Sequence, residues 1–282
     1  MYTVLSTLGS GANGTVYLVS HVGQKLAIKV GSDPIDLLTE VNMLKQVHKP
    51  LSPKVGPMVC DVDDLVIQGK TVPFYAMEYV EGERLDRYVE RVGAEWVPVL
   101  IVQLLSRLHI LHSQGWSFGD LKPENVIVDR ATKQVCLIDF GGVSKHGHAI
   151  RQFTEEYDRA YWQAGDRRAE IKYDLFSLAV MMIRLTVGKE VWKSISTGPR
   201  QTNTLCDIIR DNDHLYPFRV PLVKAFHGQY SSAEEMKREV IRCISQPASK
   251  QVVPKKKGGA WMTGLFITLA LVLAGSMFVA WM

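Results

Sequence analysis

The sequence predicts an α+β fold with a small, mostly β lobe and a larger, mostly α lobe, followed by one C-terminal transmembrane helix. Three observations carry the prediction. Apolar β-branched runs and glycine turns alternate over residues 1 to about 80, helical periodicity dominates from Glu83 to about 245, and the run from Ala260 to Met282 contains no charged residue. A hydrophobic content of 46% in 282 residues is enough to build the core of such a domain.

The small lobe is expected to be a sheet with one helix. Runs rich in Val, Ile, Leu and aromatic residues predict strands at 2–8, 15–19, 25–30, 65–67 and 74–79. The helix is expected to begin with Asp33 as its N-cap and Pro34 at its first position, and to end near residue 47. Its predicted apolar stripe is Leu37, Leu38, Val41, Leu44 and Val47.

The large lobe is expected to contain three long helices, at 96–113, 174–187 and 232–244. The second is almost continuously apolar, which predicts that it is buried. A short hairpin is expected at 125–128 and 135–138. The two lobes, divided near residue 80, are predicted to form one domain over residues 1–245.

The C-terminal segment breaks with this pattern. Residues 246–259 contain Pro, Lys and Gly without periodicity and predict a basic linker, and 260–282 predicts the membrane helix. Trp261 and Trp281 are 20 positions apart, roughly 30 Å along a helix, so they would lie at opposite membrane interfaces. A buried core helix is the alternative, but an all-apolar helix beside Lys255–Lys257 fits a globule poorly. Because lysine-rich flanks stay cytoplasmic, the domain is expected in the cytoplasm.

Charge and cysteine content disfavour nucleic-acid-binding, zinc-binding and disulfide-bonded classes of protein. The net charge of +4 is spread along the chain, so no nucleic-acid partner is indicated. The cysteines are far apart and favour free thiols in a reducing compartment over zinc or disulfides. They are Cys60, Cys136, Cys206 and Cys243. His109 and His112 share a helix face and are expected to be core or helix-end residues.

A glycine-rich stretch, Gly9, Gly11 and Gly14 with Val16, directly follows the first predicted strand. In a dinucleotide-binding turn these glycines would open a helix, whereas 15–19 is predicted to be a second strand. The stretch is therefore expected to be a hairpin lid whose glycines let backbone amides approach phosphates.

Lys29 follows Ala27 and Ile28 on the next strand, within reach of a phosphate beneath this lid. A solvated edge charge is the alternative for a strand lysine. Glu40, on the helix that follows, could pair with Lys29 and orient it, and an exposed helix carboxylate is the alternative there.

The most specific signal is the hexamer Asp-Leu-Lys-Pro-Glu-Asn at 120–125, followed by Asp-Phe-Gly at 139–141. A hexamer of fixed sequence is too rare to arise by chance in one chain. The spacing places Asp120, Asn125 and Asp139 around one hairpin. This suits a carboxylate that accepts a hydroxyl proton beside two oxygen ligands for magnesium.

On these motifs the chain resembles eukaryotic-type (Hanks-type) serine/threonine protein kinases, of the kind that bacteria carry as membrane-bound enzymes. The resemblance covers about residues 1–245 and implies the bilobal protein-kinase fold. It implies transfer of the γ-phosphate of ATP, with Mg²⁺, to Ser and Thr hydroxyls of protein substrates at a membrane surface. It also implies a bacterial cell membrane and self-association for autophosphorylation, with a eukaryotic tail-anchored protein as the alternative location.

The resemblance also implies roles for individual residues. Asp120 matches the catalytic base and Lys122 the lysine that contacts the transferred phosphate, while Asn125 and Asp139 match the magnesium ligands. Met77 matches the residue behind the adenine pocket, Glu78–Val80 match the hinge, and Asp174 matches the buried Asp that supports the catalytic loop. The implied ATP-binding set is Leu8, Gly9, Gly11, Gly14, Val16, Ala27, Lys29, Glu40, Met77, Glu78 and Val80.

The chain departs from the family at two places. Phe118-Gly119 stands where the family has His-Arg before the catalytic Asp, so no arginine is available there to bind a phosphorylated activation loop. The activation segment offers Ser144, Thr154 and Tyr157 as phosphate acceptors, but it ends without Ala-Pro-Glu, and 226–232 lacks the arginine that pairs with that Glu. Losing both partners of a buried ion pair costs less than losing one, so the domain is still expected to fold.

Two other functions remain open. Phe-Gly-Asp at 118–120 is similar to the catalytic loop of aminoglycoside and choline kinases, but Lys122 and the full glycine stretch disfavour a small-molecule kinase. The altered activation segment is compatible with a membrane-tethered pseudokinase without turnover. The intact Lys29, Asp120 and Asn125 disfavour that interpretation.

Overall fold

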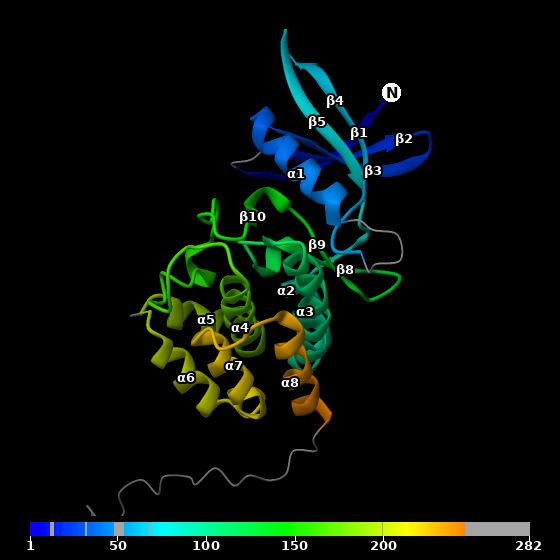
Figure 1. Ribbon diagram of the computed structural model, residues 1–282. Helices are drawn as coiled ribbons and strands as arrows, with labels where there is room; N and C mark the ends of the chain where they lie inside the picture. Colours follow the sequence, from blue (N-terminus) through cyan, green and yellow to red (C-terminus); the bar gives the residue numbers. More distant parts are fainter. Residues whose placement is uncertain (12–13, 32, 48–53, 68, 199, 246–282) are drawn as a thin grey trace, which may run out of the picture. The chain divides into compact units, whose positions relative to one another are not determined.

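A five-stranded antiparallel sheet forms the small lobe, in the order β1-β2-β3-β5-β4. The strands are β1 (Thr3–Gly11), β2 (Gly14–His21), β3 (Gln24–Val30), β4 (Val59–Ile67) and β5 (Lys70–Glu78). In Figure 1 the hairpin of β4 and β5 extends beyond the rest of the sheet. The structure is a computed structural model and describes residues 1–11, 14–31, 33–47, 54–67, 69–198 and 200–245. The predicted linker and membrane helix, 246–282, lie outside the described residues.

One helix, α1 (Pro34–Val47), packs against β4 and β5. Its first turn is capped as predicted, since Asp33 Oδ1 accepts hydrogen bonds from the backbone N–H of Ile35 at 2.7 Å and of Asp36 at 3.2 Å. Leu38 is 49% exposed, so it lies outside the buried stripe. The buried residues of that stripe are Leu37, Val41 and Leu44.

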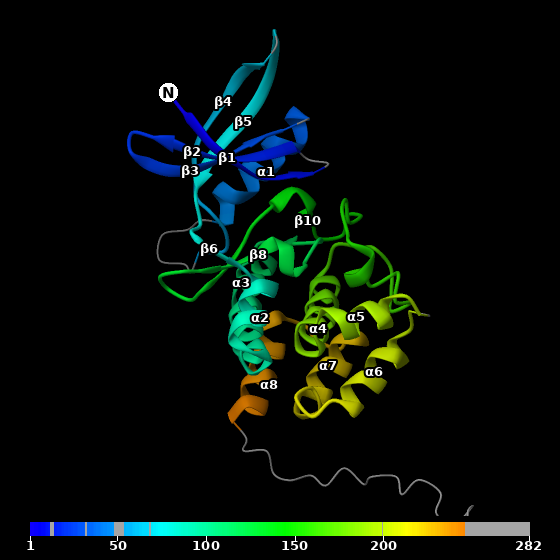
Figure 2. The ribbon, with the colours of Figure 1, turned by 180° about the vertical axis from the view of Figure 1, so that it is seen from behind.

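The large lobe consists mainly of helices (Figures 1 and 2). The three predicted long helices are present as α3 (Val97–Ser113), α4 (Ile171–Val187) and α8 (Ala233–Ser245). The sequence did not resolve four shorter ones, because a segment of 8 to 10 residues completes too few turns to show its period. They are α2 (Leu85–Val92), α5 (Lys189–Ser196), α6 (Thr202–Asp211) and α7 (Arg219–Phe226).

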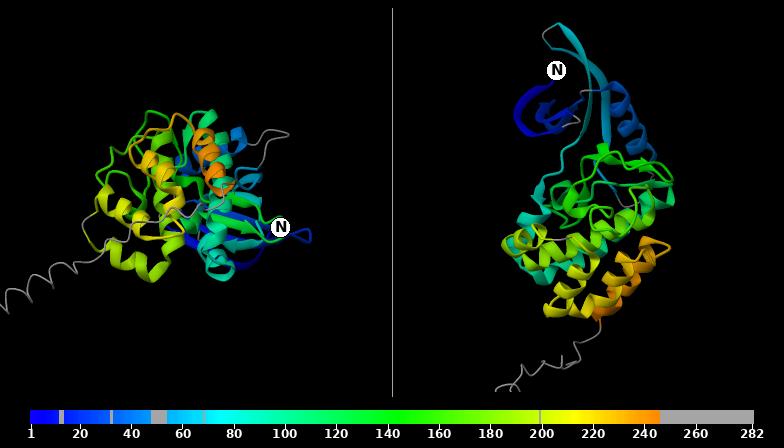
Figure 3. Two further views of the ribbon diagram at one scale, coloured as in Figure 1. Left: turned by 90° about the horizontal axis from the view of Figure 1, so that it is seen from below. Right: turned by 90° about the vertical axis from the view of Figure 1, so that its left-hand side faces the viewer.

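Two small sheets lie in the segments that follow the five-stranded sheet. The predicted hairpin is present as β8 (Val126–Asp129) and β9 (Val135–Leu137), and β6 (Gly82–Arg84) adds a third strand beside β8. The second sheet pairs β7 (Trp116–Ser117) with β10 (Ser144–Lys145). Figure 3 shows the sheet lobe and the helical lobe from two further sides.

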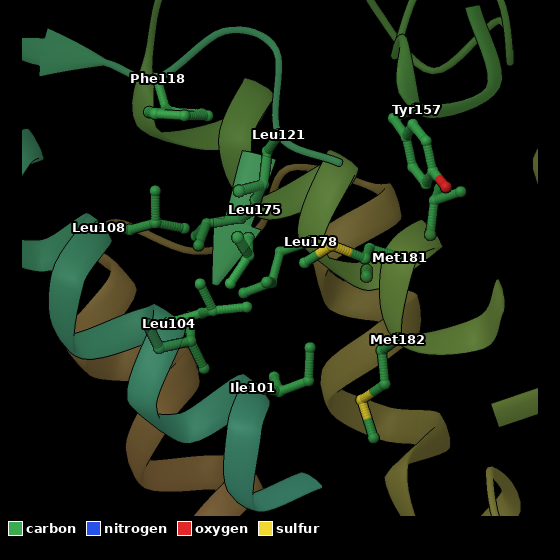
Figure 4. Close-up of a cluster of buried hydrophobic side chains, with 14 of the residues drawn as sticks. Ile101, Leu104, Leu108, Phe118, Leu121, Tyr157, Leu175, Leu178, Met181 and Met182 are labelled. Atoms are coloured by element: carbon green, nitrogen blue, oxygen red, sulfur yellow. The ribbon is translucent and has the colours of Figure 1, made fainter. Parts of the chain in front are cut away.

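The core of the large lobe lies between α3, α4 and α8, which pack against one another directly or through α7. Every residue from 173 to 185 of α4 is buried, as its apolar sequence predicted. In Figure 4, Ile101, Leu104 and Leu108 of α3 lie near Leu175 and Leu178 of α4. Among the described residues one segment, 94–113, is long and apolar enough to cross a membrane, and it contains this core helix.

Candidate active site

The loop that carries Asp120 is fastened to α4 through one buried carboxylate. Asp174 is fully buried and accepts hydrogen bonds from the backbone N–H groups of Phe118 at 2.8 Å and Gly119 at 2.9 Å. Its Oδ2 also lies 2.8 Å from Nε2 of the buried His112. The supporting position expected for Asp174 is therefore confirmed, and His112 is a core residue that binds this carboxylate.

The unusual pair before Asp120 has a steric explanation. Gly119 has φ +84°, and a Cβ there would lie 2.6 Å from the carbonyl oxygen of Gly142. Phe118 is buried and packs edge-on against Phe140, with ring centroids 5.4 Å apart. Glycine at 119 thus lets this loop lie close to the Asp-Phe-Gly segment.

We expect Gly119→Ala to lower both stability and activity. The left-handed backbone costs a non-glycine residue about 1–3 kcal/mol, and the contact with Gly142 adds a displacement of the loop that carries Asp120. Small displacements of a catalytic group reduce rates by roughly tenfold to a hundredfold. Gly115→Ala is the matched control, because Gly115 has φ +81° but open space around its Cβ position. Equal melting temperatures and equal kcat in the two variants would contradict the steric explanation.

The Asp120 carboxylate is surrounded by donors from two segments. Its Oδ2 accepts hydrogen bonds from Lys122 Nζ at 2.6 Å and from Asn125 Nδ2 at 3.3 Å. Its Oδ1 accepts one from the hydroxyl of Thr154 at 2.8 Å. Oδ1 can accept a further hydrogen bond, so the group can still take a proton from a substrate hydroxyl.

Thr154 has a role that the sequence did not reveal. Its hydroxyl donates to Asp120 and also accepts a hydrogen bond from Lys122 Nζ at 3.1 Å, so it closes a ring of three residues. Thr154 was expected only as a phosphate acceptor, together with Ser144 and Tyr157. Those two side chains are buried. Thr154 lies 34 positions after Asp120 in an irregular segment, where no spacing rule could have paired the two.

A second cluster of charges lies where the sheet lobe meets the Asp-Phe-Gly segment. Lys29 is buried, and its Nζ lies 2.8 Å from both Glu40 Oε2 and Asp139 Oδ1. Glu40 is buried as well, so the structure supports the pairing interpretation over the exposed one. Glu40 Oε1 also accepts hydrogen bonds from the hydroxyl of Tyr75 at 2.9 Å and the backbone N–H of Phe140 at 3.0 Å.

These contacts change the proton affinity of the groups. Burial alone would lower the pKa of Lys29, but the charges of Glu40 and Asp139 outweigh it and raise the pKa above its ordinary value. Burial likewise tends to raise the pKa of Asp139, and Lys29 outweighs it, so that this pKa is lowered. Both groups are therefore charged at neutral pH.

Asn125 and Asp139 offer a donor set that suits magnesium. Asn125 uses its amide N–H₂ to bind the carbonyl oxygen of Asp120 at 2.8 Å, which leaves its amide oxygen as a ligand. The Asp139 side chain is 48% exposed, and the backbone of this residue has φ +57°. Among the described residues no three His, Cys, Asp or Glu side chains cluster as metal ligands. One carboxylate and one amide oxygen still fit Mg²⁺, which keeps several waters and also binds phosphates.

The glycine stretch is a hairpin, as predicted, because β2 follows it directly. Gly14 has φ +123°, and a Cβ there would lie 2.0 Å from the carbonyl oxygen of Val30 on β3. Gly9 and Gly11 have open space around their Cβ positions. The hairpin is therefore tightly packed at Gly14 and open at Gly9 and Gly11. This arrangement suits a lid over a phosphate chain.

The other predicted nucleotide residues are spread over neighbouring strands. Val16 pairs with Lys29 across β2 and β3, and Ala27 pairs with Met77 across β3 and β5. Leu8 is 45% exposed on β1. Glu78 ends β5, and Val80 lies between β5 and β6. Their roles toward ATP remain predictions from the resemblance.

The end of the activation segment has its own buried ion pair. Asp158 is fully buried and accepts hydrogen bonds from Arg167 Nε at 2.8 Å and the hydroxyl of Tyr173 at 2.9 Å. Arg159 Nη1 lies 2.7 Å from Glu170 Oε1. These pairs stand where the expected Glu and Arg of the family are both missing, which explains how the segment is held without them.

Comparison with known proteins decides the family. The family model described as protein kinase domain matches residues 2–252 of the chain. The chain belongs to the protein kinase family. This kinase is 42% identical over 273 residues to the serine/threonine-protein kinase YabT of Bacillus subtilis (strain 168). The aligned region covers 92% of this kinase and 80% of YabT. The resemblance to eukaryotic-type serine/threonine kinases and the two-lobed fold are thereby confirmed.

Two further relatives match over smaller shares of both chains. The serine/threonine-protein kinase pkn2 of Myxococcus xanthus is 32% identical over 210 residues, 67% of this kinase and 24% of that protein. The maternal embryonic leucine zipper kinase of Xenopus laevis is 32% identical over 155 residues, 51% of this kinase and 22% of that protein. Protein kinases as a family use ATP together with Mg²⁺.

Proposed function

We propose that this kinase transfers the γ-phosphate of ATP to Ser and Thr hydroxyls of proteins at a membrane surface. The observation that carries the proposal is the ring formed by Asp120, Lys122 and Thr154. It places a proton acceptor and a cation side by side. The same loop carries Asn125, and the next segment carries Asp139 in contact with Lys29.

Each charged group has a task in phosphate transfer. The substrate hydroxyl oxygen bonds to the γ-phosphorus as the bond from that phosphorus to the bridging β,γ-oxygen breaks, and the hydroxyl proton passes to Asp120. Lys122 offsets negative charge on the transferred group, and Lys29 holds the phosphates that leave as ADP. Asn125 and Asp139 would hold the magnesium, which supplies positive charge beside the phosphates when bound.

Membrane attachment belongs to the same proposal. It is supported by the charge-free run 260–282 and by the three lysines before it, which favour a kinase domain on the cytoplasmic side. Attachment would confine the enzyme to substrates and to copies of itself at that surface. The bacterial cell membrane is proposed because of the likeness to YabT of Bacillus subtilis.

The test is a transfer assay on the full-length chain in mild detergent, with Mg-ATP as the phosphate donor. The acceptors are the kinase itself, a generic protein and small alcohols. We expect label on Ser and Thr of protein, and none when the metal is chelated. Label only on a sugar or amino alcohol would favour a small-molecule kinase, and ATP binding without transfer would favour a pseudokinase. Either outcome would overturn the proposal. The anchor is tested separately on the membrane fraction of cells that express the full chain. Release of the chain from these membranes by an alkaline carbonate wash would contradict the anchor.

A further inference from the structure

A cavity of about 480 Å³ lies beside the proposed active site, on the side of α5. Lys122 lines it and also contacts Asp120 at 2.6 Å, so the cavity begins at the catalytic ring. We call it the α5 cavity. Its lining comes from the catalytic loop, the activation segment, α4 and α5, namely Lys122, Glu124, Thr154, Glu156, Tyr157, Arg184, Lys189, Trp192, Lys193 and Ser196. Its size falls within the usual range of ligand sites.

Arg184 is the residue of this cavity that most strongly indicates a ligand. It lies on α4, and only 8% of the residue is exposed. Within the described residues its guanidinium makes no hydrogen bond and no ion pair. Asp86, whose charge Arg184 influences without contact, is paired with Arg84 at 2.7 Å. The Arg184 nitrogens are not among the buried polar atoms that lack a partner; Arg184 lines the cavity, so an anion that enters it can bind this guanidinium.

The other charged residues of the cavity strengthen this conclusion. Lys189 and Lys193 stand one helical turn apart on α5, both exposed and both without an ion pair in the described part of the chain. With Arg184 and Lys122 they give four cations in the lining against two carboxylates, Glu124 and Glu156, so positive charge is in excess. Such a cluster attracts an anion of a flexible substrate and fixes its position.

The two acids of the cavity already have partners. Glu156 accepts a hydrogen bond from the indole N–H of Trp192 at 3.0 Å. Glu124 lies 3.5 Å from Arg84. A basic side chain of a substrate would have to compete for these carboxylates and would meet four cations as well.

We infer that the α5 cavity binds an anionic side chain of the protein substrate, with Arg184, Lys189 and Lys193 as specificity-determining residues. The anion is the carboxylate of an Asp or Glu, or the phosphate of an already phosphorylated residue. Because Lys122 joins the cavity to Asp120, this side chain lies within about four residues of the accepting Ser or Thr. The inference rests on the proposed kinase activity.

The test measures kcat/KM of the full-length chain on short peptides with one Ser. Each peptide carries Asp, Glu, phosphoserine, Ala or Arg at one position near the Ser. We expect an anionic residue in at least one position to raise kcat/KM by about tenfold over Ala, and Arg to lower it. Transfer without this preference, or a preference for Arg, would overturn the inference and leave the kinase activity standing. No transfer to any peptide or protein would overturn the proposed function itself.

Variants assign the preference to the cavity. Arg184→Gln should reduce the ratio of kcat/KM for the anionic and neutral peptides by about tenfold, and Lys189→Gln with Lys193→Gln by about threefold, since exposed charges contribute less. The second variant changes only exposed residues, so it tests the inference even if Arg184→Gln fails to fold. The control replaces two exposed lysines of the sheet lobe, Lys25→Gln with Lys70→Gln, and should leave the ratio unchanged.

The two sources of the anion are separated by the same peptides. Preference for phosphoserine alone indicates a substrate that another phosphorylation has prepared, and equal preference for Asp and Glu indicates an acidic sequence. Both results support the cavity as the site if the variants reduce them. A preference that survives all three substitutions would place recognition elsewhere and refute this assignment.

Discussion

Replacing Asp120 by Asn is expected to lower kcat for phosphate transfer by roughly a hundredfold to ten-thousandfold, the usual contribution of a general base. The amide has nearly the same shape as the carboxylate, so the ring with Lys122 and Thr154 changes little in volume. It cannot take up the hydroxyl proton, and its N–H₂ group cannot accept the hydrogen bond from one of those two partners. Turnover of a protein acceptor at saturating ATP measures the effect.

Two further measurements separate chemistry from folding in this variant. Its affinity for ATP and its melting temperature should stay close to those of the parent, because Lys29, Glu40 and Asp139 are untouched. Asp211→Asn is the matched control, since Asp211 lies on the surface of α6 with a side chain that is 70% exposed. A kcat within tenfold of the parent in a folded Asp120→Asn variant would show that another group accepts the proton.

The sequence predicted the parts of the site that depend on short motifs. Asp120, Lys122 and Asn125 lie within six consecutive positions, so one loop places them together. Lys29 and Glu40 are 11 positions apart on a strand and the helix after it, and their pairing was predicted from the resemblance to the family, with an exposed carboxylate as the alternative. Within the hexamer, local structure alone determines which side chains can meet.

Contacts between distant segments could not be predicted in this way. Tyr75 binds Glu40 across 35 positions, Thr154 binds Asp120 across 34, and His112 binds Asp174 across 62. Each joins elements whose packing depends on the whole core. The α5 cavity was not predicted for the same reason, because α5 has only two turns and its cations line the same cavity as Arg184 of another helix.

Asp174→Ala is expected to cost about 3–5 kcal/mol in the free energy of unfolding, which places it among the most damaging single substitutions in the domain. The change leaves the backbone N–H groups of Phe118 and Gly119 and the ring of His112 buried without their acceptor. Each unsatisfied buried donor costs about 1–3 kcal/mol. In a domain of this size, the melting temperature should fall by about 10 °C.

Removing the Asp174 carboxylate should also impair catalysis, because this carboxylate holds the loop that positions Asp120. Asp174→Ala should therefore lower kcat even below its melting temperature, whereas Asp174→Asn, which keeps one acceptor oxygen, should have an intermediate effect on both. Asp207→Ala on α6 is the control, since Asp207 is 60% exposed and such surface changes stay within about 0.5 kcal/mol. If Asp174→Ala lowered stability while leaving kcat of the folded protein unchanged, α4 would support the core without positioning the catalytic loop.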